Sequence, residues 1–357
     1  MLRRICFSIA CLSLCAAGAR AQSNVSVIAS GLDNPRGLTF GPDGNIYVAE
    51  GGRGGDLSTT IVDCPQVPFP VGPYKGGFTA RISKVTPAGV RTTVVDGLPS
   101  SQTTKESGNL ASGVADVAFV GDQLYALLAG AGCSHGLLGT TNAILRVNAN
   151  GVTSQVVDLS AFQQANPVAQ PELGDFEPDG TWYSMVAVRG DLYAVEPNHG
   201  EVVRVTPTTG AITRVVDVSA SQGHIVPTAI AYHGNFFFGN LGKFPVSPGT
   251  ESVFKMTPSG QLHEWENNLT TVLGLAYDRE DRLYVLESMT AAGLPGPGEV
   301  GTGKILRIAP SGAIDTIASG LSFPTAMTLG PDGALYVSNL GFAGPSAGQI
   351  LRVTIPN

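Results

Sequence analysis

Short runs in which apolar and polar residues alternate recur along the whole chain, and turn residues separate them. Alternation with a period of two is typical of half-buried β-strands. Six of these runs carry an aromatic residue at the same place in a longer unit: residues 45–48, 123–126, 191–194, 235–238, 282–285 and 334–337. An apolar strand and a tight turn precede each run, and a strand ending in a basic-apolar pair follows it. A fourth strand follows that pair. The sequence therefore predicts a unit of four strands that occurs six times.

Six four-stranded units predict an all-β fold, a six-bladed β-propeller. The last unit stops after its third strand, at Thr354, and an unassigned strand at 25–29 stands near the N-terminus. We expect this N-terminal strand to complete the last blade, because closing the ring removes exposed sheet edges. Residues 22–357 are therefore predicted to form a single propeller domain.

Residues 1–21 have the pattern of a secretory signal peptide. Two arginines precede an apolar run over 5–17, and small residues at 19 and 21 provide a cleavage site. The run is shorter than the roughly 20 apolar residues that a membrane-spanning helix needs, so we expect no membrane span. Cleavage near Ala21 predicts a secreted or periplasmic protein.

The net charge of the chain limits the classes of partner that it can bind. The 357 residues include 21 basic and 28 acidic side chains, a net charge of −7. Removal of 1–21 takes away three arginines and no acid, which leaves 18 basic against 28 acidic residues and a charge of −10. A nucleic-acid partner requires clustered Lys and Arg, so we expect none here. We also expect the mature chain to be a monomer.

Two cysteines, Cys64 and Cys133, remain after the signal peptide is removed. An even pair in a chain bound for an oxidising compartment predicts a disulfide. Two buried thiols are the alternative.

The predicted loops are long on one face of the propeller only. Successive strands of a blade run antiparallel, so the second-to-third connections and the blade crossings share that face. The long segments are 51–79, 97–112, 129–142, 159–182, 241–251 and 288–302. Long loops on a rigid scaffold are where binding and catalysis concentrate. We therefore expect this long-loop face to bind a small molecule, a peptide or a glycan.

Polar residues end most of the second strands, on the long-loop face: Glu50, Glu196, Asn240, Glu287 and Asn339. The three carboxylates belong to alternate blades, and we expect them about 20 Å apart given a strand spacing of about 4.8 Å. One ion cannot bridge that distance. Our interpretation is that these groups accept backbone N–H bonds from the long loops, although they also remain candidates for the binding face.

Residues at the start of the innermost strands lie closest to the propeller axis: Arg36, Asp116, Ser184, Thr228, Leu273 and Thr325. Arg36 and Asp116 come from adjacent blades and are expected to pair. The alternative is a polar channel mouth that holds a ligand or a divalent cation, Ca²⁺ or Mg²⁺, with Asp116 as a candidate catalytic residue. His135, His199 and His224 also belong to the long-loop face, without metal-ligand spacing.

Asp175, Glu177 and Asp179 resemble the first half of a calcium loop, because oxygen donors alternate before a glycine. The twelfth position is Val186, so no bidentate Glu closes the loop, and an acidic turn is the alternative. The sequence contains no Gly-x-Ser-x-Gly, His-Glu-x-x-His or phosphate-loop motif.

The stretch from 31 to 50 resembles an NHL-type propeller repeat. Segments 226–249, 281–287 and 330–339 are similar to the ScyD/ScyE family, and the resemblance spans essentially the whole mature chain. It implies a secreted or periplasmic six-bladed propeller of unsettled activity. More distant similarity to propeller lyases and lactonases implies a divalent ion at the axis.

Two hypotheses follow. In the first, the protein is a binding or interaction module that uses its long-loop face. In the second, it is a divalent-metal-assisted lyase or lactonase centred on Asp116, with supporting groups from the set Glu50, Glu196, His199, His224 and Glu287.

Overall fold

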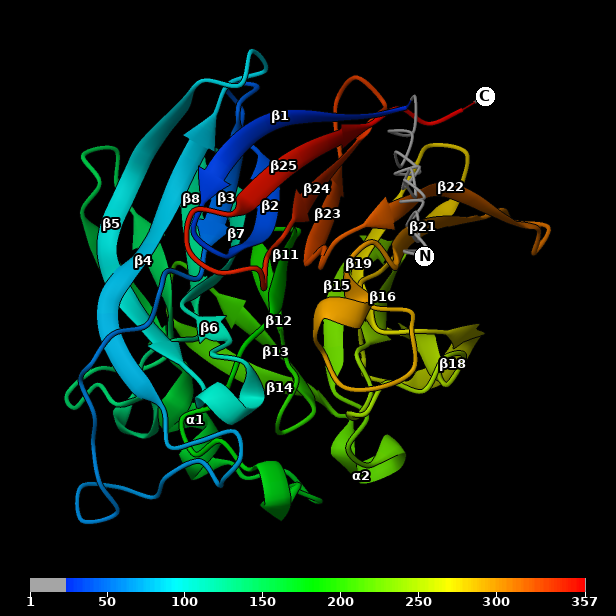
Figure 1. The fold of residues 1–357 in the computed structure, drawn as a ribbon. Coiled ribbons are helices and arrows are strands. Elements are labelled where there is room, and N and C mark those ends of the chain that lie inside the picture. The colour runs from blue at the N-terminus through cyan, green and yellow to red at the C-terminus, as the bar shows by residue number, and fades with distance from the viewer. Residues whose placement is uncertain (1–23, 357) are drawn as a thin grey trace, which may run out of the picture.

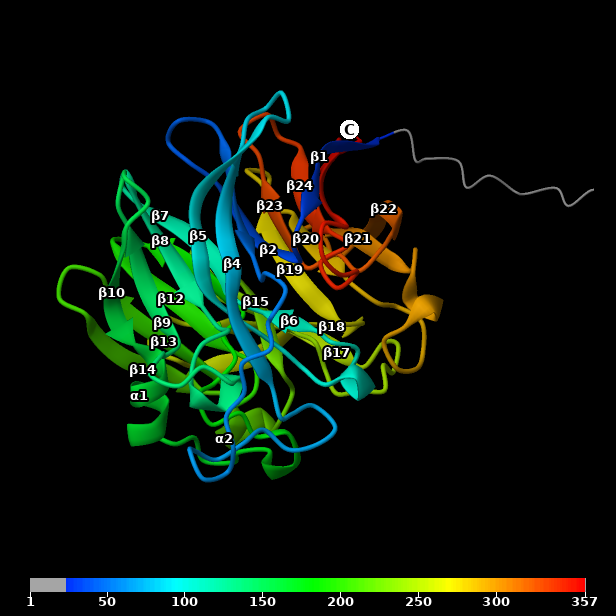
Figure 2. The ribbon, with the colours of Figure 1, turned by 60° about the vertical axis from the view of Figure 1, so that its left-hand side comes forward.

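A computed structural model describes residues 24–356, and these residues form six antiparallel sheets arranged around an axis (Figures 1 and 2). The six-bladed propeller expected from the sequence is confirmed. The signal-peptide prediction for 1–21 lies outside the described residues. No helix within 24–356 is long and apolar enough to cross a membrane.

The blades follow one another along the chain. Blade 1 has five strands, β2 (Pro35–Phe40), β3 (Ile46–Glu50), β4 (Lys75–Val85), β5 (Arg91–Gln102) and β6 (Ala111–Ser112). Blade 2 has β7 (Val114–Val120), β8 (Gln123–Leu128), β9 (Ala143–Val147) and β10 (Thr153–Asp158). Blade 3 has β11 (Ser184–Val188), β12 (Asp191–Glu196), β13 (Glu201–Thr206) and β14 (Ala211–Asp217).

The second half of the ring repeats this order. Blade 4 has β15 (Pro227–His233), β16 (Asn235–Asn240), β17 (Glu251–Met256) and β18 (Leu262–Leu269). Blade 5 has β19 (Val272–Tyr277), β20 (Leu283–Glu287), β21 (Gly303–Ile308) and β22 (Ile314–Leu321). Blade 6 has β23 (Ala326–Leu329), β24 (Leu335–Asn339), β25 (Gly348–Val353) and β1 (Val25–Leu32).

The ring closes through the two ends of the described chain. Strand β1 pairs antiparallel with β25, with Val25 opposite Val353 and Ser26 opposite Arg352 (Figure 1, blue beside red). The N-terminal strand therefore supplies the outermost strand of the last blade, as predicted. Closure makes the innermost strands of blades 6 and 1 neighbours. The residues at the start of these two strands therefore lie side by side at the axis.

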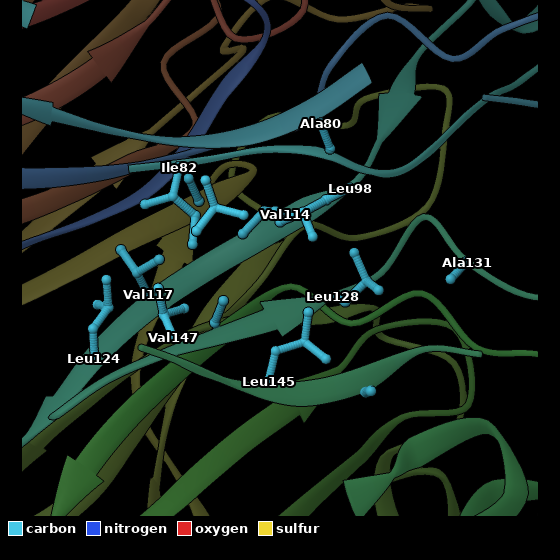
Figure 3. Packing of buried hydrophobic residues seen from close by; sticks show 14 residues of the cluster. Ala80, Ile82, Leu98, Val114, Val117, Leu124, Leu128, Ala131, Leu145 and Val147 are labelled. Carbon is cyan, nitrogen blue, oxygen red and sulfur yellow. The ribbon is translucent and has the colours of Figure 1, made fainter. Parts of the chain in front are cut away.

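The core consists of apolar layers between adjoining blades. Ile82 and Leu98 of blade 1 pack with Val114, Val117 and Leu145 of blade 2 in one such layer (Figure 3). Each strand presents alternate residues to such a layer, and the burial of apolar surface there stabilises the sheets by about 25 cal/mol for each Å² removed from water. The rigid ring that results carries the loops.

The long connections gather at one end of the propeller, together with α1 (Leu159–Ala165) and α2 (Ser219–Gln222) (Figure 1). Asp158 caps α1 by accepting a hydrogen bond from the Ala161 N–H at 2.8 Å. Four short 3₁₀ turns lie in the same connections: η1 (Lys105–Ser107), η2 (Cys133–His135), η3 (Leu173–Asp175) and η4 (Pro297–Glu299).

Blade 1 departs from the predicted pattern in its outer strands. Part of the segment expected as a loop over 97–112 is strand, because β5 continues to Gln102 and pairs along β4 as far as Lys75. This long β4–β5 ribbon carries the insertion of blade 1 toward blade 2. There Cys64 and Cys133 form the predicted disulfide, with their Cα atoms 6.2 Å apart.

Candidate functional site

A pocket of about 510 Å³ opens on the long-loop face, among the loops of blades 1, 2 and 3. The disulfide forms part of its wall, and prolines and one aromatic ring provide most of the apolar surface. We call it the lateral pocket; its lining residues are Asp63, Cys64, Pro65, Cys133, Gln163, Gln164, Pro167, Val168, Pro171, Phe176, Pro178, Asp179 and His199.

The ring of Phe176 stacks on His199 at one side of the lateral pocket, with centroids 4.9 Å apart and planes 2° from parallel. The His199 N–H donates to Glu196 Oε2 at 2.5 Å, and His199 Nε2 lies 3.0 Å from the Glu177 carbonyl oxygen. Both ends of the histidine are thereby held. The stack is a preformed feature of the pocket wall.

The polar groups of the lateral pocket are mostly acceptors. The carboxylate of Asp179 accepts from the Ser134 N–H at 2.7 Å and from the Ser134 hydroxyl at 2.6 Å. Gln163 donates to Glu201 at 2.9 Å, while its buried Oε1 has no hydrogen-bond partner. Two carboxylates line the pocket, those of Asp63 and Asp179, and no Lys or Arg does. The pocket therefore suits hydrogen-bond donors better than anions.

A buried polar network lies beneath these loops. The Tyr74 hydroxyl donates to Glu177 Oε1 at 2.7 Å, and Glu177 Oε2 is 3.8 Å from His135 Nε2. Ser101 Oγ lies 2.8 Å from His135 Nδ1, and His135 Nε2 lies 3.0 Å from the Gly180 carbonyl oxygen. Burial raises the pKa of Glu177 well above its usual range and lowers that of His135, so burial favours the neutral form of both side chains.

The grouping of Ser101, His135 and Glu177 has the residue types of a hydrolase triad, but it lacks access to substrate. The Ser101 and His135 side chains are fully buried. In the neutral tautomer that donates to the Gly180 carbonyl, Nδ1 accepts the Ser101 hydroxyl proton. The network fastens β5 to the loops of blades 2 and 3. Sequence reasoning identified His135 and Glu177 but not Ser101 or Tyr74, which no motif marks.

The residues that end the second strands each accept a backbone N–H from another segment. All five accept a backbone N–H: Asp33 to Glu50 at 2.6 Å, Thr181 to Glu196 at 2.7 Å, Ser252 to Asn240 at 2.8 Å, Thr270 to Glu287 at 2.6 Å and Ser322 to Asn339 at 3.0 Å. Basic residues neutralise two of these carboxylates, Arg91 at Glu50 and Lys304 at Glu287. Four of these side chains therefore anchor a loop, and Asn240 anchors the start of β17.

A cavity of about 50 Å³ lies on the axis, and every blade contributes to it. We call it the axial cavity; its lining residues are Gly37, Leu38, Asp116, Tyr183, Ser184, Ala229, Ile230, Leu273, Gly274, Leu275, Ala326 and Met327. Tyr183 spans it, because this residue of blade 3 donates its hydroxyl to the Thr325 carbonyl oxygen at the start of blade 6, at 2.6 Å.

Asp116 is the one carboxylate among the residues that line the axial cavity. Its two oxygens accept the N–H groups of Val117 at 2.8 Å and Met185 at 2.7 Å. Burial raises the pKa of Asp116 to about 7, against these two hydrogen bonds, which lower it. The expected ion pair with Arg36 does not form: no acidic group of the described residues lies within 4.0 Å of the Arg36 guanidinium.

A polar neighbour of His224 is Asp175. His224 Nε2 is 3.9 Å from Asp175 Oδ2, and burial lowers the pKa of His224 while raising that of Asp175 to about 6. His135 belongs to the buried network, and His199 to the lateral pocket. The three histidines therefore differ in their polar partners.

The donors proposed for a divalent cation do not assemble a site. Within residues 24–356, no group of three or more His, Cys, Asp or Glu is placed to hold a metal ion. Glu177 bonds to Tyr74 and Asp179 to Ser134, so the half calcium loop of the sequence is not formed. At the axis, both oxygens of Asp116 accept backbone N–H groups. These residues do not fit a bound Ca²⁺ or Mg²⁺ ion.

Solved structures with the same architecture are known. The chain is similar to an oxidoreductase described as a glucose dehydrogenase from Thermus thermophilus, with 19% identity, a TM-score of 0.56, and coverage of 92% of this chain and 99% of that one. It is similar to the calcium-binding protein regucalcin from Agrobacterium tumefaciens, with 13% identity, a TM-score of 0.54 and 92% coverage of both chains. It is also similar to streptogramin B lyase, with 14% identity, a TM-score of 0.51, and coverage of 93% and 97%.

These likenesses show that the protein is a six-bladed β-propeller, a class whose members include lyases, lactonases and dehydrogenases. At these identities they show the fold alone. No family model matches the sequence, and no curated protein matches it. The ScyD/ScyE resemblance therefore stays a prediction.

Proposed function

We propose that this protein is an exported binding module of the ScyD/ScyE type that holds a small organic molecule in the lateral pocket. The observation that carries the proposal is the pocket itself, about 510 Å³ in volume and lined mainly by apolar groups. Sites for small molecules have volumes of roughly 300 to 1,000 Å³ and combine apolar walls with a few polar groups. The disulfide and the prolines preform its shape and reduce the entropy lost on binding.

The lining of the pocket restricts the ligand. Asp63 and Asp179 place negative charge beside it and no Lys or Arg lines it, so an anion is disfavoured. Phe176 and the prolines offer flat apolar surfaces, and Gln163 Oε1 needs a donor. The best match is a neutral or positively charged molecule with an apolar body and N–H or O–H groups. Peptides and glycans are the competing ligands.

The positions of the candidate residues do not favour the metal-assisted lyase or lactonase hypothesis. That hypothesis requires polar groups that converge on one reacting atom. Of its candidates, only Asp116 lines the axial cavity and only His199 lines the lateral pocket. Glu50, Glu196 and Glu287 each anchor a loop of a different blade.

Export is part of the proposal because of the predicted signal peptide and the disulfide between Cys64 and Cys133. Expression of the full chain in a host that exports proteins tests it. Sequencing of the purified N-terminus is expected to start at Gln22. A chain that keeps residues 1–21 and stays in the cytoplasm would overturn this part.

The binding proposal is tested with the neutral apolar fluorophore N-phenyl-1-naphthylamine, followed by a fragment set of neutral and amine-bearing compounds in ligand-observed NMR. Gln164 is exposed on α1 and lines the pocket, so Gln164→Trp fills the space without disturbing the core. The matched control is Gln155→Trp, at an exposed position of β10 outside the pocket. We expect saturable binding of the fluorophore that Gln164→Trp weakens about tenfold or more and Gln155→Trp leaves unchanged.

Equal loss in both variants, or binding without saturation, would refute the lateral pocket as the site. If the small molecules fail while an oligosaccharide or peptide set binds and Gln164→Trp abolishes that binding, the pocket is retained and the ligand class is corrected.

A further inference from the structure

Arg36 is a buried cation at the start of β2, the innermost strand of blade 1. Its residue surface is only 8% exposed. Nη2 donates to the Ala111 carbonyl oxygen at 2.5 Å, and the guanidinium carbon lies 4.4 Å from the centre of the Phe342 ring. The ring interaction and one neutral carbonyl are weak compensation for a buried charge.

The guanidinium lacks the counter-ion that a buried arginine ordinarily has. No carboxylate of the described residues pairs with it, whereas Arg81, Arg91 and Arg214 each pair with Asp or Glu at 3.0 Å or less. Its Nη1 is buried and has no hydrogen-bond partner. An unpaired buried donor on a permanent charge is strongly unfavourable unless something binds it. The free N–H groups therefore indicate a place for an anion.

The arginine is held rigidly in this position. The Thr325 hydroxyl donates to the Pro35 carbonyl oxygen at 2.6 Å, and the Ser338 hydroxyl donates to the Arg36 carbonyl oxygen at 2.6 Å. Both donors belong to blade 6, so ring closure fixes the backbone from which the side chain extends. A preorganised donor loses little entropy when a ligand binds.

The surroundings of Arg36 lie at the axis and outside the lateral pocket. Burial raises the pKa of the Tyr183 hydroxyl. The charge of Arg36 acts to lower this pKa and the charge of Asp116 acts to raise it, so both charged groups lie near Tyr183. Gly37, the next residue, lines the axial cavity together with Tyr183 and Asp116. None of Ala111, Phe342 and Tyr183 lines the lateral pocket.

We propose that Arg36 binds the carboxylate group of a small organic acid at the long-loop end of the propeller axis. A single positive charge matches a monoanion, and the planar guanidinium matches a planar carboxylate. A phosphate dianion would leave one charge unpaired beside Asp116. Gly37, the residue after Arg36, lines the axial cavity and Arg36 itself does not, so the proposal places the carboxylate at the guanidinium and not inside that cavity.

Acetate and benzoate are the probes for this site, each compared with sodium chloride at the same ionic strength. Binding is followed through the side-chain N–H signals of Arg36 in NMR and through the midpoint of thermal unfolding. We expect both anions to shift the Arg36 signals saturably and to raise the midpoint, which chloride does not do. Arg36→Met is expected to weaken both responses about tenfold or more, and Arg36→Lys to weaken them less.

The control variant is Arg204→Met, which removes one positive charge from blade 3. The Arg204 side chain is 47% exposed, and Arg204 does not line the axial cavity. It should leave acetate and benzoate binding unchanged. Without any organic acid, Arg36→Met should melt at or above the wild-type temperature, because it removes an unpaired buried charge. A structural role for Arg36 predicts a lower melting temperature instead.

Two results would overturn the proposal. One is a wild-type protein on which acetate and benzoate act no differently from chloride. The other is an Arg36→Met protein that binds either anion as tightly as the wild type. Because Arg36 is not among the residues that line the lateral pocket, failure here leaves the binding of N-phenyl-1-naphthylamine unaffected.

Discussion

The buried carboxyl group of Asp116 should make the stability of the propeller depend on pH. Its pKa is raised from 3.8 to about 7 by burial in the axial cavity, so the folded protein prefers the neutral form. A group whose pKa is raised on folding contributes full stability below its unfolded pKa. That contribution is lost as the pH rises through the folded pKa. Asp116 should therefore cost stability progressively between about pH 4 and pH 7.

The size of the effect follows from the two pKa values. The difference between about 7 and 3.8, at about 1.4 kcal/mol for each pH unit, is worth about 4 kcal/mol at pH values above both. In Asp116→Asn this dependence disappears, because the amide does not ionise. The amide keeps only one acceptor for the Val117 and Met185 N–H groups, which costs about 1 to 3 kcal/mol at every pH.

The assay is urea unfolding of the protein from pH 4 to pH 8, for the wild type, Asp116→Asn and the control Asp122→Asn. Asp122 lies exposed in the tight turn of the same blade. The free-energy difference between the wild type and Asp116→Asn should change by about 4 kcal/mol across this range in favour of the variant. Parallel pH profiles for these two proteins would refute the reasoning, whatever their absolute stabilities.

Three other variants test the packing and the loops. In Gly37→Ala the new Cβ would lie 1.8 Å from Asp116 Oδ1, so the thermal midpoint should fall by about 10 °C or more, and an unchanged midpoint would contradict the contact. Replacing Cys64 and Cys133 by Ser opens a loop with a sequence separation of 69 and should cost about 4 kcal/mol in urea unfolding under oxidising conditions; equal stability would argue against the disulfide. Glu177→Gln should unfold at nearly the wild-type urea concentration, because burial disfavours the charged carboxyl and the amide is isosteric with its neutral form. A large loss of stability would contradict this effect of burial.

The number of blades and the closure of the ring could be predicted from the sequence. Strand alternation and tight turns are local features of the sequence, and they recur in all six units. The unmatched strand at 25–29 has one place to pair, beside the last strand of the incomplete sixth unit. The disulfide could also be predicted, because Cys64 and Cys133 are the two cysteines that follow the predicted signal peptide. Six repeats that agree with one another leave little freedom for a different topology.

The candidate sites could not be predicted in the same way. The sequence places Arg36 and Asp116 on adjacent blades, but not the direction in which either side chain lies. Tyr183 stands one residue before the strand start that sequence reasoning chose, and its reach across the axis depends on the opposite blade. Side-chain pairing is set by distances of a few ångströms between segments remote in sequence, whereas strand patterns depend on neighbours two residues apart. The sequence repeats therefore determine the six-bladed ring. The packing of side chains across the axis determines that the Arg36 guanidinium has no carboxylate partner among the described residues.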